Sequence, residues 1–166
     1  CAYTPLKTVT PLSVFVGAIP GAIPFMLGWV SATGSFGIEP GILFMIQFFW
    51  QFPHFWAIGW MMHSDYQKAG INMLPTGSPG NATALQIILY TLWTIVISII
   101  PVFSFTGALQ LSVVAAAVVG AVGLMLLWTG LQLYRNHSVA NAKKLMTMSI
   151  AHITAIQWIY VLDKFI

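Results

Sequence analysis

Hydrophobic residues fall into five long runs, separated by short stretches rich in Gly, Pro, Asn and Ser. Each run approaches the ~20 residues that a helix needs to cross a bilayer, and none alternates apolar and polar residues as barrel strands do. Because only helices and closed barrels satisfy the backbone in lipid, the pattern predicts an all-α polytopic membrane protein. We expect the first helix to be kinked, since it contains Pro20 and Pro24. The predicted spans cover approximately residues 11–33, 42–62, 84–103, 109–134 and 145–162.

The composition agrees with a membrane protein and argues against several other classes. Of the 166 residues, 58% are hydrophobic and 5% are charged, whereas soluble domains carry roughly 25% charged residues. The six Lys and Arg residues are scattered, so no nucleic-acid-binding surface is indicated. The single cysteine, Cys1, excludes an internal disulfide framework and a thiolate metal cage.

Basic residues are distributed unequally between the two predicted sides of the membrane. One side carries five of them, whereas the other carries a single one near the C-terminus. Cytoplasmic loops are enriched in Lys and Arg, so we expect the first side, with the loop that holds Asp65, to face the cytoplasm or a mitochondrial matrix. The five are Lys7, Lys68, Arg135, Lys143 and Lys144, and the sixth is Lys164.

Polar residues share one face of the second predicted span. With 3.6 residues per turn, a narrow arc of the helix carries Gln47, Gln51, His54, Ile58, Met61 and Asp65. Polar groups at membrane depth usually face a bundle interior or a water-filled cavity. The alternative is hydrogen bonding between helices, worth roughly 1 kcal/mol or less per pair. We favour that alternative for Gln47 and a functional role for His54.

The loop predicted after this span, residues 65–75, is a candidate metal site. Mg²⁺ is commonly held by one or two carboxylates together with substrate phosphates, so Asp65 is a possible ligand. Lys68 adds a positive charge that could bind the same phosphates. The spacing alone is equally compatible with an ordinary acid at a helix end and an ordinary basic residue on the cytoplasmic side.

Several short motifs occur in the order found in one family of membrane enzymes. They are Tyr3-Thr4-Pro5-Leu6-Lys7, residues 17–24, Gly28-Trp29, Trp50-Gln51-Phe52-Pro53-His54-Phe55, and Asp65-Tyr66 through Met73-Leu74-Pro75. With these motifs the chain resembles the haem O synthase (protohaem IX farnesyltransferase) branch of the UbiA-type membrane prenyltransferases. The resemblance covers essentially the whole chain and is densest from Tyr3 to Pro75.

This resemblance implies a single domain of nine helices around a central cavity, in which residues 1–166 would supply helices five to nine. The chain begins with Cys rather than Met, so we expect a C-terminal fragment that is inactive alone. The implied reaction transfers a farnesyl group from farnesyl diphosphate to a vinyl group of haem b, which is a substrate and not a cofactor. It requires Mg²⁺ and makes haem O for terminal oxidases. The implied location is a bacterial inner membrane or a mitochondrial inner membrane, with the lipid bilayer and haem A synthase as partners.

The resemblance also implies roles for individual residues. Catalytic roles fall to Asp65, Lys68 and His54, with Asp65 as the metal ligand. Substrate-binding roles fall to Tyr3, Lys7, Trp50, Gln51 and Tyr66. The chain departs from the general family pattern at Ala69, where many members have a second Asp, and at Thr8, where many have a second basic residue.

Two other functions remain open from the sequence. One is a UbiA-type prenyltransferase that acts on a quinone or chlorin precursor, although Ala69 and the motif around His54 argue against it. The other is a non-catalytic membrane protein that transports a solute or binds haem. The near absence of charged residues within the spans weakens an ion-coupled transporter.

Overall fold

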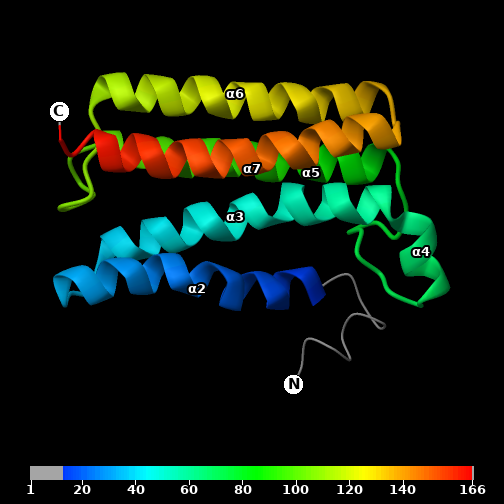
Figure 1. Cartoon of the computed structure of the whole chain (residues 1–166), viewed down its shortest axis with the longest axis horizontal. Coiled ribbons are helices and arrows are strands. Elements are labelled where there is room, and N and C mark those ends of the chain that lie inside the picture. The colour runs from blue at the N-terminus through cyan, green and yellow to red at the C-terminus, as the bar shows by residue number, and fades with distance from the viewer. Residues whose placement is uncertain (1–12, 166) are drawn as a thin grey trace.

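The computed structural model describes residues 13–165, and all the regular secondary structure in this part of the chain is helical, with no strand. The all-α prediction is therefore confirmed for these residues (Figure 1). The helices are α2 (Ser13–Thr33), α3 (Ile38–Met61), α4 (His63–Lys68), α5 (Asn81–Ile99), the short 3-10 helix η1 (Ile100–Val102), α6 (Val113–Arg135) and α7 (Val139–Leu162).

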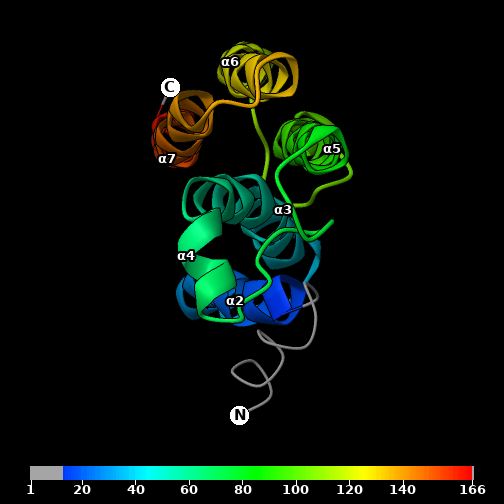
Figure 2. The same cartoon turned by 90° about the vertical axis from the view of Figure 1, so that its right-hand side faces the viewer.

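The five long helices run up and down beside one another, and α3 lies at the centre (Figure 2). It packs against α2 on one side and against α5 and α7 on the other, while α6 packs against both α5 and α7. Large side chains of α3 fill the interface with α2 and α5, since Phe52 and Trp56 are almost completely buried. The centre of α3 is therefore fixed by packing from three neighbours.

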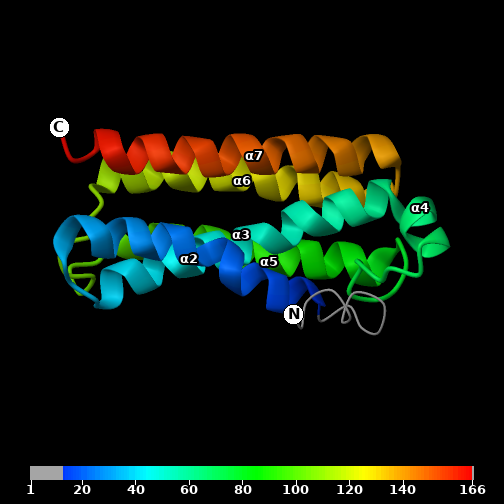
Figure 3. The same cartoon turned by 60° about the horizontal axis from the view of Figure 1, so that its bottom comes forward.

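Four of the described helices are long and apolar enough to cross a membrane, namely α2, α5 continued into η1, α6 and α7. The fifth predicted span, α3, has 24 residues and is long enough too. It falls outside this set because Gln47, Gln51, Pro53 and His54 lower its hydropathy. Both prolines of α2 lie inside one continuous helix, which changes direction along its length (Figure 3).

The last two long helices do not begin at the residues where the predicted spans begin. Helix α7 begins at Val139 rather than near residue 145, because Ser138 accepts a hydrogen bond from the Asn141 N–H and caps the helix. Lys143 and Lys144 therefore lie in a helix and not in a loop. Similarly, Ser112 caps α6 through the Ala115 N–H, so residues 109–112 precede the helix.

The two ends of the bundle differ in charge. One end, which we call the basic end, holds α4 and the turn between α6 and α7 (Figure 1). The basic end carries Lys68, Arg135, Lys143 and Lys144. Among the described residues, Lys164 alone of the Lys and Arg residues belongs to the opposite end.

Carboxylates hold the α5–α6 loop (residues 103–112) at the opposite end. Glu39, in the first turn of α3, accepts the Ala108 N–H at 3.0 Å. Asp163, just after α7, accepts both the hydroxyl and the N–H of Ser112, the latter at 2.8 Å. Lys164 donates to the Ala108 carbonyl at 3.2 Å. Two of the three acidic residues of the chain therefore hold this loop in place by hydrogen bonds.

We expect the contact between Asp163 and Ser112 to be lost in acid. The hydroxyl and the N–H of Ser112 hold the pKa of Asp163 below its ordinary value of 3.8. Since the folded pKa is depressed, the stabilisation is complete above the ordinary value and disappears as the pH falls through the lower folded value. Hydrogen-exchange protection of the Ser112 N–H should fall in that range.

The Leu111 N–H is the control for this measurement. It donates to the Pro101 carbonyl at 2.9 Å, and neither group titrates. Asp163→Asn should lower Ser112 protection already at neutral pH and remove its pH dependence. Equal loss of protection at Leu111 and Ser112 on acidification would instead indicate general unfolding of the loop.

Candidate functional site

The chain bends sharply between α3 and α4, which separates Asp65 from the polar face of α3. Met62 has φ −100° and ψ 17°, away from helical values, and joins the two helices. Helix α4 then runs across the bundle end toward α2 (Figure 2). The prediction that Asp65 lies in a loop and continues the arc of Gln47 and His54 was therefore wrong. The arc assumed a straight helix, whereas Asp65 lies in the separate helix α4.

Asp65 and Lys68 lie on one side of α4, one turn apart. The Lys68 Nζ is 3.6 Å from an Asp65 oxygen, and the side chains are 79% and 60% exposed respectively. Exposed ion pairs of this kind contribute ~1 kcal/mol or less, so a bound ligand could replace the contact at little cost. Tyr66, next to Asp65, is half-buried.

Asp65 is the one acidic residue at the basic end among those that the structure describes. The described residues contain no group of three or more His, Cys, Asp or Glu side chains that could hold a metal. An exposed carboxylate whose ion pair, among the described residues, is with Lys68 fits Mg²⁺ that takes most of its ligands from phosphate oxygens and water. It does not fit a metal enclosed entirely by protein.

Gln51 joins α3 to α2. Its Nε2 donates to the Ala18 carbonyl at 3.0 Å and lies 3.3 Å from the Gln47 carbonyl, and the residue is buried. A Cβ at position 21 would overlap the Gln51 amide, so Gly21 leaves room for this side chain between the helices. The Gln51 amide thus links two helices, and the substrate-binding role expected for Gln51 stays a prediction.

His54 joins α3 to α7 instead. Its Nδ1 is 2.8 Å from the Ser149 hydroxyl, and Trp50 Nε1 donates to the Ser149 carbonyl at 2.6 Å. The rings of Trp50 and His54 are stacked, with centroids 4.9 Å apart and 16° between their planes. The polar arc of α3 is therefore divided, with Gln51 directed to α2 and His54 to α7.

Sequence reasoning missed Ser149. It lies 95 residues from His54 in a run of otherwise unremarkable helix, so no local spacing signals the contact. Tyr3 and Lys7, two predicted substrate-binding residues, lie outside the described residues. The structure therefore brings together His54 and Trp50 on α3, and Asp65 and Lys68 on α4.

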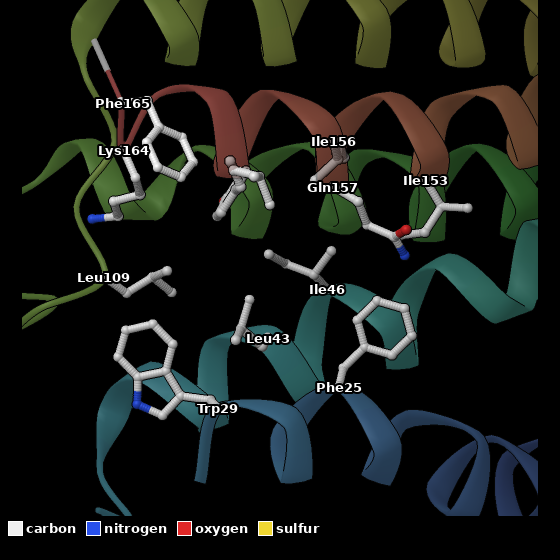
Figure 4. Close-up of a pocket in the computed structure, with 12 residues that line it drawn as sticks. Phe25, Trp29, Leu43, Ile46, Leu109, Ile153, Ile156, Gln157, Lys164 and Phe165 are labelled. Atoms are coloured by element: carbon white, nitrogen blue, oxygen red, sulfur yellow. The ribbon is translucent and has the colours of Figure 1, made fainter. Parts of the chain in front are cut away.

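A cavity of about 430 Å³ lies between α2, α3 and α7 near the opposite end (Figure 4). Its walls are mainly aromatic and aliphatic, and Gln157 extends from α7 toward the α2 side. About 22 Å of helix separates Ile46, which lines this cavity, from the end of α3 at Met61. The cavity is therefore distinct from the surroundings of Asp65. It is lined by Phe25, Trp29, Leu43, Ile46, Leu109, Ile153, Ile156, Gln157, Tyr160, Val161, Lys164 and Phe165.

Comparison with known proteins agrees with the resemblance drawn from the motifs. A relative in Christiangramia forsetii, named protoheme IX farnesyltransferase, is 62% identical over 164 residues, which are 99% of this chain and 55% of that protein. A relative of the same name in Flavobacterium psychrophilum is 60% identical over 166 residues, covering 100% of this chain and 55% of that protein. The chain thus spans about half the length of the curated relatives it matches.

A more distant relative in Koribacter versatilis, with the same name, is 38% identical over 98% of this chain and 54% of its own length. No solved structure matches the chain. The family profile of the UbiA prenyltransferases matches residues 1–153. The chain therefore belongs to the UbiA prenyltransferase family.

Proposed function

We propose that this chain is part of an enzyme that transfers a farnesyl group from farnesyl diphosphate to a vinyl group of haem b, which yields haem O. The observation that carries the proposal is the 62% identity, over nearly the whole chain, to a relative named for this activity. The motif from Trp50 to Phe55 and the single exposed acid of α4 support it from the chain itself.

In the proposed reaction the C–O bond of the allylic diphosphate breaks, and the diphosphate leaves with the electron pair. Asp65 would hold Mg²⁺, which when bound neutralises the diphosphate, and Lys68 would add a positive charge to the same group. The haem vinyl electrons then form the new C–C bond. Water adds to the resulting cation and loses a proton, giving the hydroxyethylfarnesyl group.

Aromatic rings next to His54 could stabilise the carbocation. The Trp50 ring stacks on His54, and the Phe55 ring lies edge-on to it at 5.6 Å between centroids. Aromatic faces attract cations by roughly 0.5–2 kcal/mol, more when water is excluded. We propose that this part of α3 faces the reacting groups, with the basic end on the cytoplasmic side of a bacterial inner membrane.

The proposal is tested by expressing the full reading frame that encodes this chain in membranes and supplying haem b, farnesyl diphosphate and Mg²⁺. Chromatography with mass spectrometry should detect haem O, and chelation of Mg²⁺ should abolish its formation. Parallel reactions with a quinone precursor test the alternative acceptor. Prenylation of the quinone without haem O would contradict the proposal, as would the absence of any product.

A further inference from the structure

The Ser149 hydroxyl determines which nitrogen of His54 carries the proton. Ser149 Oγ lies 2.7 Å from the Met146 carbonyl, which can only accept, so the single hydroxyl hydrogen is used there. The same oxygen lies 2.8 Å from His54 Nδ1 and can therefore only accept from it. Nδ1 must carry the hydrogen, and the neutral ring keeps its lone pair at Nε2.

The edge of the ring that bears Nε2 is open. Nε2 has no hydrogen-bond partner in residues 13–165, and it is not one of the buried polar atoms that lack a partner there. The lone pair is thus not used by residues 13–165 and is available to a ligand.

We propose that Ser149 is a positioning residue that orients His54 so that its Nε2 can bind the iron of the haem substrate. The proposal rests on the proposed function, in which haem b is a substrate. A histidine that binds a metal almost always donates its other N–H to an oxygen, which fixes the tautomer and the ring orientation. Ser149 supplies that oxygen, and the stacked Trp50 ring restricts rotation further. Coordination at one fixed nitrogen would set the position of the porphyrin relative to α3.

The test is a haem titration of the protein expressed from its full reading frame, in detergent micelles and without farnesyl diphosphate. The wild-type protein should give the absorption and electron paramagnetic resonance spectra of histidine-ligated haem. Ser149→Ala should shift these spectra and weaken haem affinity by about 10- to 100-fold, the usual cost of losing such a supporting group. Ser149→Thr keeps a hydroxyl and should retain the wild-type spectra.

Ser98→Ala is the matched control, since Ser98 is also buried and donates to a carbonyl one turn back, but within residues 13–165 its hydroxyl has no hydrogen bond to a histidine. It should leave the spectra unchanged. His54→Gly should lose the histidine signature, and added imidazole should restore it.

Three results would overturn the inference. If His54→Gly binds haem with the wild-type spectrum, Nε2 is not the ligand, although the proposed function would stand. If Ser149→Ala changes turnover but neither spectrum nor affinity, the pair handles protons or packing instead. If the wild-type protein binds no haem, the proposed function fails and this inference fails with it.

Discussion

Asp65→Asn should abolish farnesyl transfer while leaving the protein folded and inserted. The substitution keeps the shape of the side chain and removes the charge that would bind Mg²⁺. Charge stabilisation by a metal is worth several kcal/mol, so kcat/KM should fall at least about 100-fold, equivalent to about 2.7 kcal/mol. Folding should be nearly unaffected, because the exposed pair with Lys68 contributes ~1 kcal/mol or less. The measurement is haem O formation over a range of Mg²⁺ concentrations.

The control is Asp163→Asn, which removes a carboxylate from the opposite end of the bundle, where it holds the α5–α6 loop. This variant should keep its activity in the assay and lose only local protection of the loop. Similar losses of activity in the two variants would mean that general destabilisation, and not a metal role, explains the effect at Asp65. Full activity of Asp65→Asn would remove the residue from the proposed site.

The order and approximate position of α2, α5, α6 and α7 follow from hydropathy, because a span must contain a long run of apolar residues. The first residue of α7 cannot be predicted from hydropathy, since the first turns of this helix are polar and extend beyond the apolar run. Its signal was the cap at Ser138, three residues before Asn141, and the same kind of signal at Ser112 marks the start of α6. Capping residues therefore mark the first residues of these two helices, which hydropathy alone does not locate.

The candidate site was predictable only where it depends on local sequence. The motif around His54 and the acid at position 65 can be recognised in the chain, but their relation in space depends on the bend at Met62. Likewise, Gln51 and His54 share an arc of α3, yet different neighbours accept their hydrogen bonds. The periodicity of polar residues shows which of them share a face of a helix, but not which helix packs against that face. The contact between Ser149 and His54 could therefore not be predicted.

Small residues in α6 allow it to approach α5, and a side chain at Gly123 should destabilise this crossing. A Cβ there would lie 2.6 Å from Ile95 Cγ1, much closer than van der Waals contact. Ile95 is β-branched and has little rotamer freedom in a helix, so the helices would have to move apart. Extra atoms in a packed interface cost about 1–3 kcal/mol. Gly123→Ala should therefore lower the free energy of unfolding, measured by denaturant titration in detergent micelles.

Gly120→Ala is the matched control, since a Cβ at position 120 would lie an ordinary 3.5 Å from Ile99 Cδ1. Both substitutions gain the helix propensity of Ala, about 1 kcal/mol, so this gain cancels in the comparison. The control should be neutral or stabilised, and Gly123→Ala should lie about 1–3 kcal/mol below it. Combining Gly123→Ala with Ile95→Ala should cost less than the sum of the two, because the second change removes the overlapping atoms. Equal stabilities of the two single variants would show that α5 and α6 do not require a glycine at this crossing.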